Sequence, residues 1–348
     1  MRNKVTIQDI ADALGISRNT VSKAINNSGG LADATRDKIL QKAVEMGYKQ
    51  FSYVSAAASF SHAAADETAA APAFQGEIAL FTTMFLTKSH FASLMLDKFQ
   101  REISQLGYTM NTHRVTEANL RSGTLPITFR PEQVKAIICI EMFNREYDEM
   151  VCELGLPVLF VDGPAKHGGY SLPADQLYMD NVTEISRFVR DALQRGERRI
   201  GFIGNPEHCE SFHERYLAFR FTVQMAGGTV DEKFCIRCNH PDEVAERLEA
   251  LDELPDLFVC ANDFVAGDAM AALFSLGKSV PGDVRILGFD DSSESRHSRP
   301  TMSTVHIHTQ IMAYEAVHLL MSRIKEPSLD FRTVHTQTDL IERESTQR

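Results

Sequence analysis

The sequence predicts an all-α N-terminal unit followed by an α/β body of two Rossmann-like lobes, and three observations support this fold class. The chain has 348 residues, which is too long for one ordinary core. Up to residue 50, apolar side chains recur at the helical spacing. From Glu77 onward, short runs rich in β-branched and aromatic residues alternate with amphipathic stretches, as in folds built on parallel sheets. Residues 51–75 are expected to connect the two parts.

The composition is that of a soluble globular protein. Hydrophobic residues make up 43% of the chain and charged residues 24%, which excludes a disordered or fibrous protein. A run of about 18 apolar residues is lacking, and the first residues lead into an amphipathic segment instead of a signal peptide. We therefore expect a cytoplasmic protein without membrane association. Free thiols are expected for the six cysteines, which are Cys139, Cys152, Cys209, Cys235, Cys238 and Cys260.

The charge is distributed unevenly along the chain. Residues 1–60 hold 8 Lys and Arg against 5 Asp and Glu, a net charge of +3, whereas the remaining 288 residues hold 28 against 42, a net charge of -14. A basic leading segment on an acidic body fits local binding to phosphates, with little adhesion of the body to nucleic acid.

The first unit begins with two short helices. Thr6 can cap the first one, and Gly15 ends it. Its apolar positions fall at i, i+3, i+4 and i+7 and are Ile7, Ile10, Ala11 and Leu14. Ser17 caps the second helix. The residues expected to point inward there are Val21, Ala24 and Ile25, and those expected to point outward are Arg18, Asn19, Ser22 and Lys23.

A third helix is expected over residues 33–46, ending at Gly47, with Ile39, Ala43 and Met46 facing the first two helices. The outward face of the second helix suits the major groove of DNA. Arg pairs with guanine, Asn pairs with adenine, and Lys reaches guanine or phosphate. An ordinary solvated polar face is the alternative that helix spacing alone leaves open.

The same residues resemble a known family. The stretches Val5-Thr6-Ile7-Gln8-Asp9-Ile10-Ala11, Gly15-Ile16-Ser17 and Thr20-Val21-Ser22-Lys23-Ala24-Ile25-Asn26 closely resemble the helix-turn-helix headpiece of the lactose repressor and purine repressor (LacI) family. Thr35-Arg36 and Gly47-Tyr48 match its third helix. The resemblance implies that Arg18, Asn19 and Lys23 read bases. It assigns the DNA-binding surface to Thr6, Ser17, Arg18, Asn19, Thr20, Ser22, Lys23 and Asn26.

The segment after Tyr48 departs from the family pattern. Gln50 and Phe51 replace a Pro-Asn pair, and Ala57 stands where a Leu normally wedges into the minor groove. An Ala side chain is a poor wedge, because unstacking a base step needs apolar bulk. Substitute wedges are Phe51, Val54 and Phe60. We hypothesise a hinge helix in a shifted register or a weaker central kink.

Residues 61–75 are rich in Ala and interrupted by Pro72, so we expect a tether about a dozen residues longer than the family's. A linker without any role of its own is the alternative.

Eight strands are expected in the body. The first lobe should contain strands at 78–83, 108–113, 136–140 and 158–162, and the second at 199–204, 234–238, 257–261 and 284–289. Ligands of open α/β sheets bind beyond the carboxyl ends of the strands. The polar residues directly after these strands are Thr82, Thr83, Asp162, Asn262, Asp263, Asp290 and Asp291. Helix capping is the plainer reading for most of them, and we expect Asp263 to cap the helix that follows it.

The body also resembles the sensor of the same family. The matching segments are Asp180-Asn181, Arg215 to Phe219, Ala261-Asn262-Asp263 and Gly288-Phe289-Asp290-Asp291, with Ala218 where the family usually has Gly. The resemblance implies a periplasmic-binding-protein-like arrangement and an effector site of Arg215, Asn262 and Asp290, with Asp162, Thr83 and Phe91 behind them. It places crossings between the lobes near Tyr178, Val305 and Ser328. The lobes then comprise residues 76–178 with 307–327, and 179–306 with 328–348.

The resemblance implies a repressor of carbohydrate-utilisation genes that is switched by a sugar or sugar derivative. The alternative is the same architecture responding to a nucleobase or other metabolite as co-repressor. One recognition helix per chain requires a homodimer on a pseudo-palindromic double-stranded operator. Residues 336–348 lack a leucine heptad, which favours a dimer over a tetramer.

Other classes of function find little support. Cys235 and Cys238 form a Cys-x-x-Cys near His240, but a second pair at zinc-finger spacing is missing. The group His208, Cys209 and His213 fits no recognised metal spacing. Neither a G-x-G-x-x-G or Walker loop nor a G-x-S-x-G elbow occurs. We therefore expect no enzyme, metal or cofactor. The helix-turn-helix argues against a pure periplasmic receptor.

Overall fold

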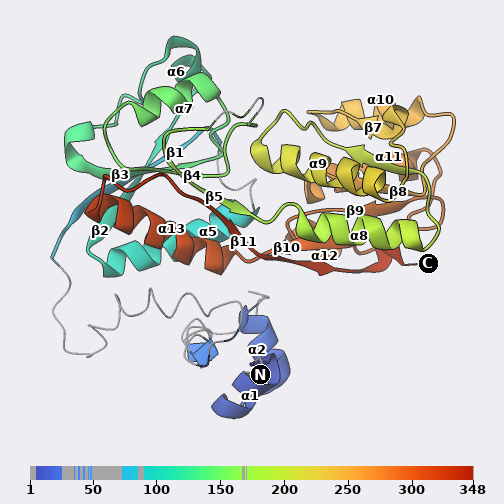
Figure 1. Ribbon diagram of the computed structural model, residues 1–348, viewed down its shortest axis with the longest axis horizontal. Helices are drawn as coiled ribbons and strands as arrows, with labels where there is room; N and C mark the ends of the chain where they lie inside the picture. Colours follow the sequence, from blue (N-terminus) through green and yellow to red (C-terminus); the bar gives the residue numbers. More distant parts are fainter. Residues whose placement is uncertain are drawn as a thin grey trace. The chain divides into compact units, whose positions relative to one another are not determined.

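Figure 1 shows the computed structural model of the chain. It describes residues 5–25, 35, 38, 39, 42, 43, 46, 48, 73–84, 90–166, 169 and 171–347. The chain divides into two compact units, Met1–Ala73 and Phe74–Arg348. Each unit is built around its own buried residues and is treated separately below.

The first unit contains α1 (Ile7–Leu14) and α2 (Arg18–Ile25). The predicted cap of α1 is confirmed, since the Thr6 hydroxyl accepts from the Asp9 N–H while the Asp9 carboxylate accepts from the Thr6 N–H. Gly15 ends α1 in the left-handed conformation, at φ 66°. The predicted inward residues that are buried are Ile10, Ala11, Val21, Ala24, Ile39 and Ala43. Most of the predicted third helix lies outside the described residues.

The first lobe of the body is a six-stranded parallel sheet in the order β11-β5-β4-β3-β1-β2. Its strands are β1 (Gly76–Thr82), β2 (Tyr108–Arg114), β3 (Val134–Ile140), β4 (Val158–Val161), β5 (Asp175–Met179) and β11 (Thr333–Thr336). The four strands predicted for this lobe are confirmed. The sequence pattern did not predict β5 or β11.

Helices cover both faces of this sheet (Figure 1). Two long helices, α5 (His90–Gln105) and α13 (Thr309–Lys325), pack against each other on one face. The shorter α6 (Glu117–Ser122) and α7 (Arg145–Cys152) lie on the other, with η2 (Pro131–Gln133) before β3. Successive strand residues point to opposite faces, so Ile78 and Leu80 join one core while Ala79 and Phe81 join another. Burial on both faces explains the nearly continuous apolar strands.

The second lobe is a smaller parallel sheet in the order β7-β6-β8-β9. Its strands are β6 (Ile200–Ile203), β7 (Cys235–Ile236), β8 (Leu257–Cys260) and β9 (Arg285–Leu287), which confirms the four predicted positions. The helices α8 (Thr183–Gln194) and α9 (Glu210–Met225) pack as one pair, and α10 (Pro241–Glu249) and α11 (Asp263–Ser275) as another. The remaining short helices are α12 (Ser293–His297), η4 (Glu232–Phe234) and η5 (Glu344–Thr346).

The chain passes between the lobes after β5, after β10 (Thr304–Ile307) and before β12 (Thr338–Ile341), which pairs antiparallel with β10. The first two crossings lie where the sequence placed them. The third prediction, near Ser328, is wrong, because residues 333–336 pair in parallel with β5 in the first sheet. The crossing therefore falls between β11 and β12. Every described cysteine is a free thiol, as predicted. Among the described residues, the structure contains no helix long and apolar enough to cross a membrane.

Asp175 fixes the edge of the first sheet. It is 1% exposed and accepts two hydrogen bonds of 3.0 Å from Arg323 of α13. Arg332, just before β11, donates to the same carboxylate from Nη2 at 3.0 Å and from its backbone at 2.8 Å. Burial alone would raise the pKa of Asp175, but the hydrogen bonds from Arg323 and Arg332 outweigh it and lower the pKa below its ordinary value of 3.8. One carboxylate thus joins β5, α13 and β11.

Replacing Asp175 with Asn should lower the free energy of unfolding of the body by about 3–5 kcal/mol, because two guanidinium groups lose a buried carboxylate. Urea unfolding at neutral pH measures this loss. The control Asp252→Asn removes an exposed loop carboxylate and should change stability by less than about 0.5 kcal/mol.

The lowered pKa also fixes the sign of the pH dependence. The contribution of Asp175 is present above pH 3.8 and is lost as the pH falls through its lowered pKa. The difference between wild type and Asp175→Asn should therefore shrink on acidification below that value. A difference that stays constant or grows there would contradict this account.

Candidate functional site: a nucleic-acid surface and a ligand cleft

The first candidate surface is the outward face of α2. The side chains of Arg18, Asn19 and Lys23 are exposed on this helix, opposite buried Val21 and Ala24. This arrangement agrees with the predicted separation of a packing face from a base-reading face. Exposed Arg and Asn can enter a groove without first breaking the packing of the unit.

The other described residues assigned to the DNA-binding surface carry hydroxyl groups on or next to α1 and α2. Ser17 accepts the Thr20 N–H at 3.1 Å, which confirms it as the cap of α2, and the two hydroxyls lie 2.7 Å apart. Ser22 is half-buried. The Thr6 hydroxyl already donates to the Asp9 carboxylate at 2.7 Å, so a phosphate would have to compete for it.

Several predicted features lie outside the described residues. They are Asn26, the hinge positions Gln50, Phe51, Val54, Ala57 and Phe60, and the Ala-rich segment up to Pro72. The hypotheses of a shifted hinge and a long tether remain predictions.

The second candidate site is marked by backbone strain at the strand ends of the body. Among the described residues other than glycine, the four with positive φ are Glu141 (56°), Asp162 (61°), Asp290 (119°) and Asp291 (52°). Each follows the carboxyl end of β3, β4 or β9 within a few residues. Such a conformation costs about 1–3 kcal/mol per residue and persists where the surrounding structure requires it, often at ligand sites.

Arg215 on α9 is the buried cation of this region. It is 2% exposed, and its guanidinium carbon lies 3.5 Å from the centre of the Phe289 ring. Nε donates to Asn181 Oδ1 at 2.8 Å and Nη1 donates to the Ala261 carbonyl at 2.6 Å. Asp290 Oδ1 lies 4.0 Å from Nη1. Arg215 therefore joins α9 to the ends of β8 and β9.

Asp162 and Asp290 approach Arg215 from different lobes. Asp162 is 5% exposed and accepts the N–H groups of Gly163 at 2.9 Å and Ser211 at 3.3 Å. Burial raises the pKa of both carboxyls, and the positive charge of Arg215 only partly offsets it. The structure thus brings together three of the predicted contact residues, Asp162, Arg215 and Asp290, with Asp162 the only one from the first lobe.

The neighbouring carboxyl of Asp291 faces elsewhere. It binds His306 Nδ1 at 2.9 Å, Arg296 Nη2 at 3.1 Å and the guanidinium of Arg343. Burial would raise its pKa, but the hydrogen bonds from His306 and Arg343 outweigh it and lower the pKa to about 2. Asp291 therefore anchors the crossing strand β10, while the Asp290 carboxylate lies 4.0 Å from Arg215.

The predicted capping role of Asp263 is wrong. The cap of α11 is Asn262, whose Oδ1 accepts the Val265 N–H at 2.9 Å. Asp263 instead accepts from the Thr304 hydroxyl at 2.6 Å and the Ser292 N–H at 2.8 Å. A Cβ on Gly288 would lie 2.2 Å from Asp263 Oδ1, so only glycine fits beside it. The capping bond uses one Asn262 oxygen lone pair and leaves its amide N–H groups for other partners.

The remaining predicted contacts are supported less directly. The Thr83 hydroxyl donates to the Glu141 carbonyl at 2.8 Å, which joins the ends of β1 and β3. Phe91 is half-buried against the core of the first lobe. Glu141 and Phe289 were not singled out as contacts from sequence, although Glu141 directly follows β3 and Phe289 lies two residues after β9. Asn181 lies in a segment that resembles the family's sensor, but its bond to Arg215 joins two parts of the chain that are distant in sequence, and the sequence does not show that they meet.

His208 also joins the lobes. Its ring lies 5.0 Å from the Phe143 ring and 5.1 Å from the Phe212 ring, measured between centroids. Burial lowers its pKa, against the attraction of Asp162. Among the described residues, no three His, Cys, Asp or Glu side chains are grouped as metal ligands.

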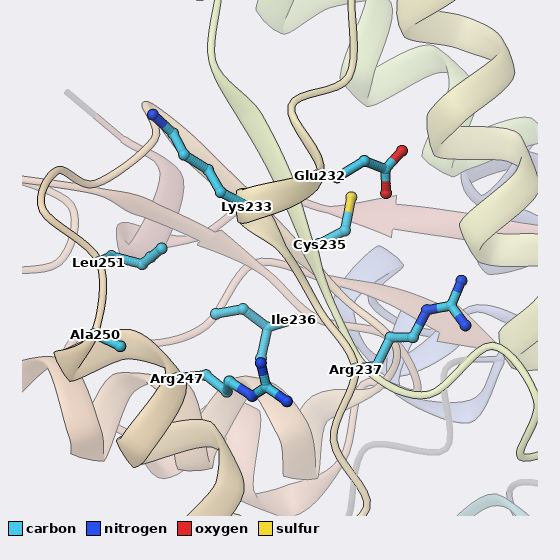
Figure 2. A pocket seen from close by; sticks show the side chains of 8 residues that line it. All are labelled: Glu232, Lys233, Cys235, Ile236, Arg237, Arg247, Ala250 and Leu251. Atoms are coloured by element: carbon cyan, nitrogen blue, oxygen red, sulfur yellow. The ribbon is translucent and has the colours of Figure 1, made fainter.

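A separate cavity of about 370 Å³ lies beside β7 and the end of α10 (Figure 2). It is lined by Glu232, Lys233, Cys235, Ile236, Arg237, Arg247, Ala250 and Leu251. Cys235 of the Cys-x-x-Cys lies on its wall, while Cys238 is buried in the core. Burial raises the pKa of each thiol to about 11, so both are protonated at neutral pH. The cavity shares no residue with the cleft around Arg215.

Comparisons with known proteins find matches for both parts of the chain. Residues 6–50 match the model of bacterial regulatory proteins of the lacI family, and residues 189–346 match the periplasmic binding protein-like domain. The HTH-type transcriptional regulator CelR of Thermobifida fusca is 26% identical, over 99% of each chain. GalR of Lacticaseibacillus casei is 26% identical, over 98% of this chain and 99% of its own. The transcriptional repressor PurR of Photobacterium profundum is 23% identical, over 98% of each chain.

Solved structures show the same fold. A complex of CelR with cellobiose has a TM-score of 0.68 and 22% identity, over 98% of this chain and all of the other. The lac repressor dimer, bound to operator and an anti-inducer, has a TM-score of 0.63 and 17% identity, over 99% of this chain and all of the other. The relatives named above are regulators, in agreement with the expectation of a regulator rather than an enzyme. With the lacI helix-turn-helix at its start and the binding-protein-like body behind it, this chain belongs to the LacI family of DNA-binding transcriptional regulators.

Proposed function

We propose that this LacI-family regulator is a cytoplasmic homodimeric repressor of carbohydrate-utilisation genes, whose affinity for a pseudo-palindromic operator is switched by a sugar-like ligand in the cleft. The observation that carries the proposal is the convergence of Asp162, Arg215 and Asp290 at strained strand ends of two lobes. The relatives CelR, whose complex holds cellobiose, and GalR support a sugar.

The DNA contacts divide by chemistry. Arg18, Asn19 and Lys23 are exposed on α2 and carry the donors and acceptors that read base edges. Hydroxyl and amide groups near the ends of the helices position the unit on phosphates. These groups are Thr6, Ser17, Thr20, Ser22 and Asn26. Two copies are needed because one short helix reads too few base pairs.

The cleft suits a polyhydroxylated ligand. The carboxyl groups of Asp162 and Asp290 accept hydrogen bonds from hydroxyls, and the amide of Asn262 donates to them. Thr83 and Phe91 belong to the first lobe, while Arg215, Asn262 and Asp290 belong to the second. A ligand that binds residues of both lobes stabilises one arrangement of the lobes over the other. The change in operator affinity is limited by the difference between the ligand's affinities for the two arrangements of the lobes.

A nucleobase co-repressor is the second candidate, since several relatives are PurR proteins at 22–23% identity. The Arg215–Phe289 stack favours the sugar. The guanidinium already covers one face of the Phe289 ring, which closes that face to a flat base.

Replacing Arg18 with Ala should weaken operator binding by about 1–3 kcal/mol and relax preference at one base pair, because a bidentate contact to a base is lost. A mobility-shift assay on the operator and its single-base variants measures both effects. The comparison variant Ser22→Ala should weaken binding evenly on all sequences. Even weakening by Arg18→Ala would reassign Arg18 to phosphate.

Replacing Arg215 with Lys should abolish most of the ligand response while leaving DNA binding intact. Lysine keeps the charge, but its single ammonium cannot reach both Asn181 and Ala261 while stacking on Phe289. Ligand affinity should fall tenfold or more, on the order of 1.4 kcal/mol, in isothermal titration with the effector. The control Arg220→Lys changes a partly exposed Arg of the same helix and should have no effect. A full response in Arg215→Lys would remove Arg215 from the site.

A further inference from the structure

We propose that the first lobe caps the start of α9 in the second lobe, and that Asp162 is thereby a positioning residue for Arg215. This role goes beyond the proposed function, because the cap forms whatever ligand the cleft takes. Hydrogen bonds connect Asp162 with the first turn of α9, that turn with Asn181, and Asn181 with Arg215.

The start of α9 lacks a cap from its own sequence. The first N–H groups of a helix have no partner within it and need acceptors from outside. Cys209 stands at the N-cap in the extended conformation of a capping residue, with φ -156° and ψ 169°, but its side chain makes no capping hydrogen bond. Ser, Thr, Asp and Asn are the residues that normally supply the capping oxygen. Since Cys209 is 2% exposed, water has little access to replace that oxygen.

The segment after β4 in the first lobe supplies the missing acceptors. The Gly163 carbonyl accepts the Glu210 N–H at 2.9 Å, and Asp162 Oδ1 accepts the Ser211 N–H at 3.3 Å. A carboxyl group keeps an accepting oxygen in either protonation state. In the opposite direction, Glu210 Oε2 accepts the Lys166 N–H at 2.6 Å. A cap that usually comes from the residues next to a helix therefore joins the two lobes here.

The capped turn holds Arg215 through Asn181. Asn181 Nδ2 donates to Glu214 Oε2 at 2.8 Å and to the Ser211 hydroxyl at 3.3 Å, and both partners lie in the first five residues of α9. Oδ1 of the same amide accepts from Arg215 Nε at 2.8 Å. Asn181 is 1% exposed, so its N–H groups depend on these protein partners. A shift of the first turn of α9 therefore shifts the group that holds Arg215.

The cap links the arrangement of the lobes to the order of the cleft. If Asp162 and Gly163 move away from α9, the N–H groups of Glu210 and Ser211 lose the acceptors that they have in this structure. Loss of a helix cap favours the frayed first turn by about fivefold. An arrangement of the lobes without this contact thus has a looser start of α9 and a less constrained Arg215.

The test is hydrogen exchange in the full chain without ligand. Asp162→Ala should speed exchange of the amides of Glu210, Ser211 and Phe212 by about fivefold, the effect of a lost cap. The Arg215 Nε–H, followed by NMR with labelled arginine, should also exchange faster. Adding Cys209→Ser should restore both rates, because Ser gives α9 a cap of its own. A general loss of structure would not be reversed by a capping residue.

Two further variants sharpen the comparison. Asp162→Ala combined with Cys235→Ser makes the same Cys-to-Ser change on β7 of the same lobe and should restore neither rate. Asp162→Asn keeps an accepting oxygen and should speed exchange less than Asp162→Ala. If Asp162→Ala does not fold, Asp162→Asn carries the test, and Cys209→Ser should reverse its smaller effect.

Three results would overturn the proposal. Unchanged exchange of the α9 amides in Asp162→Ala would contradict the cap. Faster amide exchange with an unchanged Arg215 Nε–H would remove Asp162 as a positioning residue. If Cys209→Ser restores neither rate, the effect of Asp162 on α9 is not that of a helix cap.

Discussion

The buried guanidinium of Arg215 is the interaction on which the cleft depends. A cation that is 2% exposed must be paired and hydrogen-bonded to persist. Its four partners come from three places in the chain: Asn181 after β5, Ala261 after β8, and Phe289 and Asp290 after β9. Satisfying this one charge therefore fixes the ends of two strands and the first crossing relative to α9.

Each lobe has a carboxylate anchor of its own, and one apolar cluster runs through both lobes. Asp175 holds β5, α13 and β11 together in the first lobe, and Asp291 holds β10 against the loops after β9 in the second. Between these anchors lie the three crossing segments and the strained residues Glu141, Asp162 and Asp290. Rigid lobes joined at a strained cleft can change their relative arrangement without unfolding, which a ligand-dependent DNA-binding protein requires.

Sequence alone predicted most of the fold and part of the site. Eight strands could be predicted because strands buried on both sheet faces are nearly continuous runs of apolar residues. Short strands with polar residues, such as β11 with Thr333 and His335, carry no such signal, and the third crossing was therefore misplaced. Strand ends identified Asp162 and Asp290 as ligand-site candidates, and the family resemblance added Arg215. Composition and spacing do not tell in which direction a side chain points. The sequence therefore predicts neither the bond between Asn181 and Arg215 nor the different roles of Asp290 and Asp291.

The central claim is that ligand occupancy of the body controls DNA binding by the helix-turn-helix. Its most direct test is operator affinity of the full chain, measured by fluorescence anisotropy with and without a sugar that stabilises the protein. The account predicts two chains per operator and a change in affinity of about fivefold or more at saturating sugar, the usual range of coupling between sites. An operator affinity that stays the same while the sugar is bound would contradict it.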